Sequence, residues 1–240
     1  MSVSTRAGFA WKGGRLDEPT DTLVLTGNSY FVDVRVRKSD RKLDWAFAGT
    51  KTSKPGPHPG ETTSTWHHTI DSLHDGPVED SGILWADPSD PSRTLERGEM
   101  LNPATGQVEA YEEVWEDVDP PPGTRVAFVE KDDGSAMVGI IGARRLGASR
   151  TSAWRLEAGR VVFCVGNPEG MDVSIPVSEP VEPGTRLGSW LVRECWETPD
   201  PEADAALRAS VEHSHHHEHE HVHGPCHCHG PDDDDSDVDE

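Results

Sequence analysis

The stretch Tyr30–Lys38 reads YFVDVRVRK, and apolar residues alternate along it with charged ones. Every second residue from Tyr30 to Val36 is tyrosine or valine, whereas Asp33 and Arg35 stand between them. Successive side chains of a β-strand point to opposite faces, so a period of two separates an apolar face from a polar one. The stretch therefore predicts a β-strand with one buried face.

The segment that follows, KLDWAFAGT at residues 42–50, repeats this alternation with Leu43, Trp45 and Phe47. The short sequence SDR lies between the two segments and suits a hairpin turn, so we expect them to pair. About ten further segments up to Trp196 have similar strand patterns, broken by Gly, Pro, Asp and Ser. None between them has a helical period long enough to connect parallel strands. The sequence predicts an antiparallel all-β protein, either a barrel or a sandwich.

The proline-rich sequence DVDPPPGT, at Asp117–Thr124, lies where a break between two β units is expected. After Trp196 the composition changes to polar and acidic, which indicates a tail. The predicted parts are an N-terminal β domain at 1–119, a C-terminal β domain at 120–197, and a tail at 198–240 with a short helix and a disordered remainder.

Two polar stretches rich in Pro, Gly and Ser, at 52–64 and 87–107, are expected to form long loops. Two other sequences, KDDGS and LEAGR, are typical of tight hairpin turns. Gly134 and Gly159 would supply the positive φ that such turns require.

Charge limits the classes of partner. The formal net charge is −22, and residues 197–240 contribute 14 acidic side chains against a single basic one, Arg208. This balance disfavours nucleic acid and anionic membrane surfaces, because both present phosphates. No apolar run approaches the length that spans a bilayer, so we expect a protein of the cytoplasm or nucleus. The four cysteines suggest no disulfide framework, and Cys164 and Cys195 are interpreted as small buried hydrophobic residues.

The tail contains HSHHHEHEHVHGPCHCHG at His213–Gly230. Asp200 is expected to cap a short helix that begins at Pro201. Imidazole and thiolate are preferred ligands of zinc, nickel and copper, although a run of equivalent ligands lacks a fixed geometry, so weak binding is expected and no required cofactor. The candidate metal ligands are His213, His215, His216, His217, His219, His221, His223, Cys226, His227, Cys228 and His229.

Ser236 lies in the sequence DDDDSDVDE. Acidic residues on both sides fit the substrate site of an acidophilic kinase, which makes Ser236 a candidate phosphorylation site.

Within the β region, no spacing indicates a catalytic cleft. The carboxylate pair Glu112–Glu113 is interpreted as a solvated strand face, not as a general acid and base. His67, His68 and His74 could form a small metal or proton site, but exposed histidines of a surface loop are the preferred interpretation. The tryptophans are assigned to core packing, with the alternative that two of them, Trp45 and Trp66, line a pocket.

Three motifs, DWAFAGT at 44–50, TTSTWHHTIDS at 62–72 and EEVWEDVDP at 112–120, resemble the fungal HRI protein family in their order and separation. The resemblance continues through GSAMVGIIGARR to EPGTRLGSWLVRECWE and spans residues 9–196. It implies two small antiparallel lipocalin-like β-barrel domains, location in the cytoplasm and nucleus, a casein-kinase-1-like kinase as partner, and no established enzymatic activity.

The sequence therefore predicts a non-catalytic interaction protein. Two alternatives stay open: a carrier that binds a small ligand inside a barrel lined by aromatic residues, and a metal buffer that acts through its histidine-rich tail.

Overall fold

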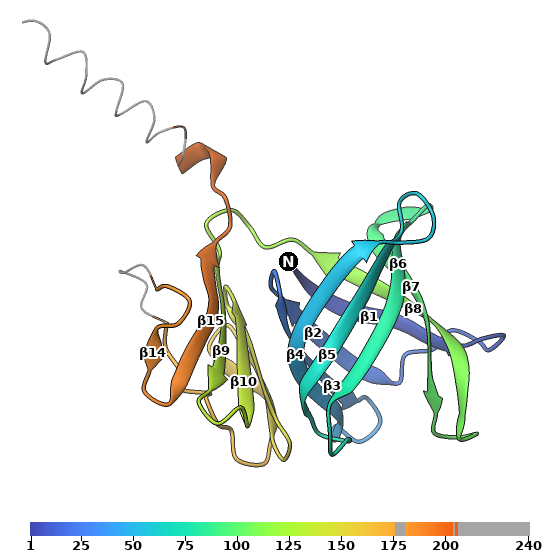
Figure 1. Ribbon diagram of the computed structural model, residues 1–240, viewed down its shortest axis with the longest axis horizontal. Coiled ribbons are helices and arrows are strands. Elements are labelled where there is room, and N and C mark those ends of the chain that lie inside the picture. Colours follow the sequence, from blue (N-terminus) through green and yellow to red (C-terminus); the bar gives the residue numbers. More distant parts are fainter. Residues whose placement is uncertain (176–180, 204, 206–240) are drawn as a thin grey trace, which may run out of the picture. The chain divides into compact units, whose positions relative to one another are not determined.

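The computed structural model describes residues 1–175, 181–203 and 205. Its first eight strands form a closed antiparallel barrel in chain order, with β8 pairing back to β1 (Figure 1). This arrangement confirms the all-β prediction and settles the first sheet as a barrel. The strands are β1 (Ser2–Trp11), β2 (Thr20–Thr26), β3 (Tyr30–Arg37), β4 (Leu43–Pro55), β5 (Thr62–Asp71), β6 (Val78–Asp87), β7 (Asp90–Asn102) and β8 (Gln107–Val118).

The stretch YFVDVRVRK forms β3, and its expected pairing with the following segment is confirmed by a register that joins Tyr30 to Thr50 and Arg35 to Trp45. The prediction of one buried face is wrong, because both faces of β3 are buried. The valines point out of the barrel toward a second sheet, whereas Asp33 and Arg35 line a cavity in the barrel interior. The barrel thus has a polar interior and an apolar outer wall.

The second half of the chain forms a seven-stranded antiparallel sheet in the order β13-β12-β11-β10-β9-β15-β14. A second lipocalin-like barrel is not confirmed, since among the described residues this sheet is not closed and has β13 and β14 at its edges. The last strand, β15, lies next to the first, β9. The bounds are β9 (Arg125–Lys131), β10 (Ala136–Ile141), β11 (Arg144–Ser149), β12 (Ala153–Glu157), β13 (Arg160–Val165), β14 (Arg186–Leu187) and β15 (Trp190–Glu197).

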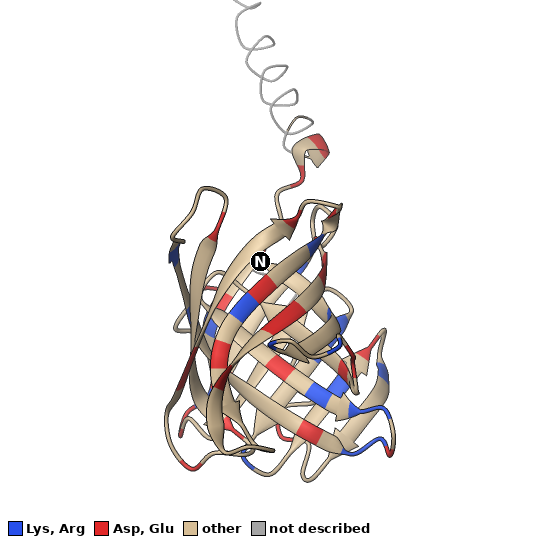
Figure 2. Cartoon of the chain, turned by 90° about the vertical axis from the view of Figure 1, so that its right-hand side faces the viewer, with Lys and Arg blue, Asp and Glu red and all other residues tan. Residues whose placement is uncertain are grey.

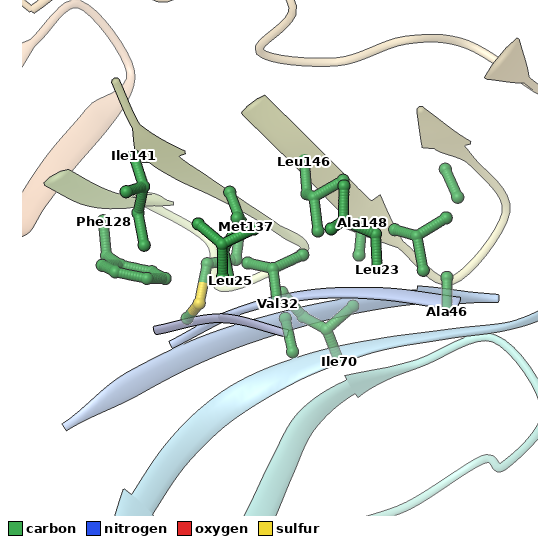
Figure 3. Close-up of a cluster of buried hydrophobic side chains, with 14 of the residues drawn as sticks. Leu23, Leu25, Val32, Ala46, Ile70, Phe128, Met137, Ile141, Leu146 and Ala148 are labelled. Atoms are coloured by element: carbon green, nitrogen blue, oxygen red, sulfur yellow. The ribbon is translucent and has the colours of Figure 1, made fainter. Parts of the chain in front are cut away.

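The main hydrophobic core lies between the outer wall of the barrel and one face of the second sheet (Figure 3). Leu25, Val32 and Ile70 from the barrel pack with Phe128 and Met137 from the sheet, and each is at most 1 % exposed. Burial of such side chains is the dominant stabilising contribution in folding. The two sheets therefore depend on each other for the burial of their apolar faces.

A second core covers the opposite face of this sheet. Trp154 and Trp190 pack there with Val173, Ile175 and Val181 from the segment that follows β13. The sheet is consequently apolar on both faces.

Two expected loops are largely strand. Residues 52–64 form the ends of β4 and β5, joined by a turn in which the Gly56 N–H donates to the Glu61 carbonyl. Most of 87–107 belongs to β7, which contributes Thr94, Glu96 and Met100 to the barrel interior. The expected turns are confirmed by positive φ at Gly134 and Gly159.

Residues Met1–Pro199 form one compact unit. The proposed boundary between residues 119 and 120 lies in the connection from β8 to β9, and as a division between domains it stays a prediction. The expected cap is confirmed, because Asp200 Oδ1 accepts from the N–H groups of Glu202 and Ala203 at 3.1 Å. No helix in the part of the chain that the structure describes has the length and apolar character needed to cross a membrane.

Candidate functional site

The barrel interior contains a cavity of about 150 Å³. Charged residues recur along the barrel strands (Figure 2), and those that face inward line this cavity together with aromatic rings. Such a lining is unusual for a protein interior, where ionisable groups are rarely buried without partners. The carboxyl groups are Asp33, Asp80, Glu96, Glu113 and Asp117, the cations are Arg35 and Lys51, and the aromatic residues are Phe31, Phe47, Trp66, Tyr111 and Trp115.

Two arginines neutralise part of this buried acid. Arg6 donates to Glu18 and to Glu113, both at 2.6 Å, which joins β1 to the β1–β2 connection and to β8. Arg35 donates to Asp33 Oδ2 at 2.8 Å. Burial disfavours the charged guanidinium of Arg35, but the charges of Asp33 and Glu113 outweigh it and raise its pKa above the usual range. These pairs hold the base of the cavity.

Glu96 lies on β7 and is 4 % exposed. Its carboxyl group accepts from the Tyr111 hydroxyl at 2.8 Å and from Trp115 Nε1 at 2.9 Å. Burial, aided by the negative charge of Glu113, raises the pKa of Glu96 to about 8. Glu96 is therefore largely protonated at neutral pH.

Glycines make room for this carboxyl group. Gly82 on β6 pairs with Gly98 on β7, and a Cβ atom on Gly82 would collide with the Glu96 carboxyl group. A Cβ atom on Gly98 would collide with the Tyr111 hydroxyl. Only glycine leaves the space that the Tyr111–Glu96 contact occupies.

The cavity also presents acceptors that the protein leaves unused. Asp33 is 2 % exposed, and its Oδ1 atom has no hydrogen-bond partner. Asp80, on β6, is half-buried and accepts a backbone hydrogen bond from Ser81, and burial raises its pKa. Buried acceptors without donors are unfavourable and call for an explanation.

Lys51, which also lines the cavity, places its ammonium group 5.3 Å from the centre of the Trp66 ring. Burial lowers the pKa of Lys51, and the charges of Glu96 and Asp117 oppose this effect. Asp117 accepts hydrogen bonds from Ser4 and, at 2.7 Å, from Thr94. A primary ammonium group on an aromatic face is thus already part of the cavity.

The three candidate histidines do not converge. His68 is fully buried beside Phe47, so its interpretation as an exposed loop residue is wrong. His68 and half-exposed His74 both contact Asp71 Oδ2, at 3.0 and 3.1 Å, whereas His67 faces Glu79.

Asp71 organises this end of the barrel. It also accepts from Trp45 Nε1 at 2.9 Å. Burial would raise the pKa of Asp71, but hydrogen bonds from His68, Leu73, Trp45 and His74 hold it well below its usual range. Among the described residues, no group of three or more His, Cys, Asp or Glu side chains could hold a metal ion.

The other candidates have mixed outcomes. The interpretation of Glu112–Glu113 as a solvated pair is wrong for Glu113, which is 4 % exposed and bound to Arg6. Cys164 is exposed and Cys195 half-buried, so the assignment of Cys164 to the core is also wrong. Trp66 lines the cavity, in agreement with the alternative of an aromatic pocket.

The predicted tail sites lie outside the described residues. These are the metal ligands His213, His215, His216, His217, His219, His221, His223, Cys226, His227, Cys228 and His229, together with Ser236.

Sequence reasoning missed Arg6 and Glu96, and it did not assign Asp33 and Arg35 to a site. The available signal was the charged residues at alternate positions of a strand, as in VDVRV. Alternation alone does not tell which face of a strand lines the barrel interior. Arg6 and Glu113 are separated by 107 positions, so their pairing depends on closure of the barrel.

The fold and cavity define a β-barrel protein with a polar, charged interior and an apolar wall covered by a second sheet. The chain belongs to the family described as Protein HRI1, whose match covers residues 2–173. The crystal structure of an uncharacterized protein from Saccharomyces cerevisiae has a similar fold, with a TM-score of 0.64 and 18% sequence identity over 81% of this chain and 98% of that one. A search of curated proteins gives no match.

Proposed function

We propose that this protein is a non-catalytic binding protein whose barrel holds a small molecule. The observation that supports this function is the cavity of about 150 Å³, with charged and aromatic groups at its wall. A cavity of roughly this volume in another protein holds benzene, so a ligand of on the order of six to ten heavy atoms fits. The lipocalin-like character implied by the family resemblance belongs to this proposal.

The proposal favours binding over catalysis because neighbouring donors hold several cavity carboxyl groups in place. Glu113 is paired with Arg6, Glu96 receives hydrogen bonds from Tyr111 and Trp115, and Asp117 receives them from two hydroxyl groups. A general acid or base has to exchange a proton with its substrate, which such fixed roles as acceptors oppose.

Association with a casein-kinase-1-like kinase stays a prediction that rests on the family resemblance. Location in the cytoplasm and nucleus, and metal buffering by the tail, also stay predictions. Kinase binding is compatible with a filled barrel, because a partner would contact the outer surface and not the interior.

Native mass spectrometry of the protein purified from its own cells tests the proposed function. Thr94 lines the cavity, so Thr94→Phe should fill it, whereas Thr52→Phe adds the same ring at an exposed position of β4. We expect a bound small molecule in the natural protein and in Thr52→Phe, and its loss in Thr94→Phe. Absence of any bound molecule from all preparations would contradict the proposal.

A further inference from the structure

Resting on this binding function, we propose that the cavity selects a small organic cation, a protonated primary amine on an apolar body, and that Asp33 and Asp80 accept its hydrogen bonds. The inference names the chemical class of the ligand and the end of the cavity that receives its charge.

The unused oxygen of Asp33 is the first argument. Arg35 donates twice to Asp33, through Nε at 3.1 Å and Nη2 at 2.8 Å, and both bonds reach Oδ2. Oδ1 is left without a donor inside a cavity-lining residue that is 2 % exposed. A carboxylate oxygen accepts and cannot donate, so the missing partner is a hydrogen-bond donor.

Asp80, on β6, supplies a second acceptor in the lining of the same cavity. The charges of His68, Arg35 and Asp33 act on its carboxyl group. No side chain within the described residues donates a hydrogen bond to Asp80. An ammonium group has three N–H donors and can bind both carboxylates at once.

The charge of the cavity wall also favours a cationic ligand. Glu96 is largely protonated, so four other carboxyl groups of the lining, Asp33, Asp80, Glu113 and Asp117, face two cationic side chains, Arg35 and Lys51. Arg6 adds a third cation through Glu113, but it is shared with Glu18. An anionic ligand would meet an excess of negative charge, whereas a cationic ligand reduces it.

Aromatic rings favour an organic cation over a bare metal ion. The faces of Phe47 and Trp66 already receive Arg35 and Lys51, at 5.0 and 5.3 Å from the ring centres. Lys51 shows the arrangement that a ligand would repeat: an ammonium group over an aromatic ring, with the carboxyl groups of Glu96 and Asp117 acting on it.

The bland explanation is a network of charges that serves only to stabilise the barrel. In such a network every charged group would have a hydrogen-bond partner, as Arg6, Glu18 and Glu113 have. Asp33 departs from that expectation, because one of its oxygens has no partner.

Calorimetric titration of the full chain at pH 7 with three matched probes tests the inference. Benzylamine carries the cation, benzyl alcohol is its neutral counterpart, and benzoate is the anion. We expect benzylamine to bind at least tenfold more tightly than benzyl alcohol, and benzoate not to bind. Asp80→Asn should weaken benzylamine at least tenfold, and Asp44→Asn, at a half-exposed position outside the cavity lining, should leave its affinity unchanged.

Asp80 is the first choice for substitution because no described side chain donates a hydrogen bond to it, whereas Asp33→Asn removes the acceptor of Arg35 and serves as a second variant. Equal or tighter binding of benzyl alcohol or benzoate, or calcium binding without amine binding, would overturn the inference. So would binding of none of the probes. A neutral or anionic molecule retained in native mass spectrometry would sink the cation assignment but keep the proposed binding function, so the two failures are distinguishable.

Discussion

The two interiors of this protein follow opposite rules. Between the barrel and the second sheet, valine, leucine and isoleucine meet phenylalanine and methionine, and the core is apolar throughout. Inside the barrel, a few ångströms away across the same strands, carboxylates and arginines line a cavity. A single strand, β3, serves both interiors with its two faces. Stability is therefore concentrated in the first region, and capacity for specific recognition in the second.

The two regions have different physical requirements. Apolar packing is non-directional and tolerates no water, whereas buried charges need partners with defined geometry. The barrel interior has most of these partners but not all, as the free oxygen of Asp33 shows. Changes in the two regions should consequently differ in kind.

The largest effect is expected from removal of the second sheet. A chain that ends at Asp119 would expose the outer barrel wall, including Leu25, Val32 and Ile70, to water. We expect it to aggregate or stay unfolded, because a large apolar patch promotes association. Solubility and size-exclusion chromatography measure this outcome. A chain that ends at Pro199 should keep the unfolding midpoint of the full protein, and a soluble, folded 1–119 fragment would refute the dependence of the barrel on the sheet.

Phe128→Ala should lower the free energy of unfolding by about 3–5 kcal/mol, because it opens a hole in the shared core. Urea denaturation followed by tryptophan fluorescence and by circular dichroism should show one common transition. Val108→Ala, at an exposed position, is the control and should change stability by less than about 0.5 kcal/mol. Separate transitions for the barrel and the sheet would argue against a shared core.

Arg35→Met should lower the free energy of unfolding by about 3 kcal/mol, since it leaves Asp33 buried without its cation. Adding Asp33→Leu to Arg35→Met should restore part of the loss, which denaturation of the two variants would reveal. If the double variant is less stable than Arg35→Met, the packing of the two side chains contributes more to stability than their charge pairing does.

The last prediction concerns pH. Because the folded-state pKa of Glu96 is raised to about 8, the folded protein keeps a proton that the unfolded chain releases above its ordinary carboxyl pKa. The stabilisation is fully present below that ordinary value, falls as pH rises toward 8, and is flat beyond it, with a slope of at most about 1.4 kcal/mol per pH unit. Denaturation between pH 5 and 9 should show this slope, and Glu96→Gln should reduce it. An unchanged slope would mean that Glu96 ionises normally in the folded protein.

The local sequence pattern predicted where the strands lie better than it predicted which of their faces are buried. The strand at Tyr30–Arg37, its hairpin partner and the all-β class follow from alternation and turn residues. The polar composition of 87–107 predicts a loop, but most of the segment forms β7, in which Thr94 and Glu96 face the barrel interior. Alternation distinguishes two faces but not which one is enclosed, so Asp33 and Glu113 were expected at the surface. Their burial depends on closure between β1 and β8, which are far apart in the chain.

During translation, β9 leaves the ribosome well before β15, although the register pairs Val126 with Trp196. In that interval one edge of β9 presents unpaired amide and carbonyl groups. The β2–β3 turn also waits for Glu194 of β15, whose carboxylate accepts from the N–H groups of Asn28 and Ser29 at 3.1 and 2.6 Å. A nascent or truncated chain therefore exposes an unpaired edge of β9, which holding chaperones can bind. Pairing of β15 with β9 covers this edge.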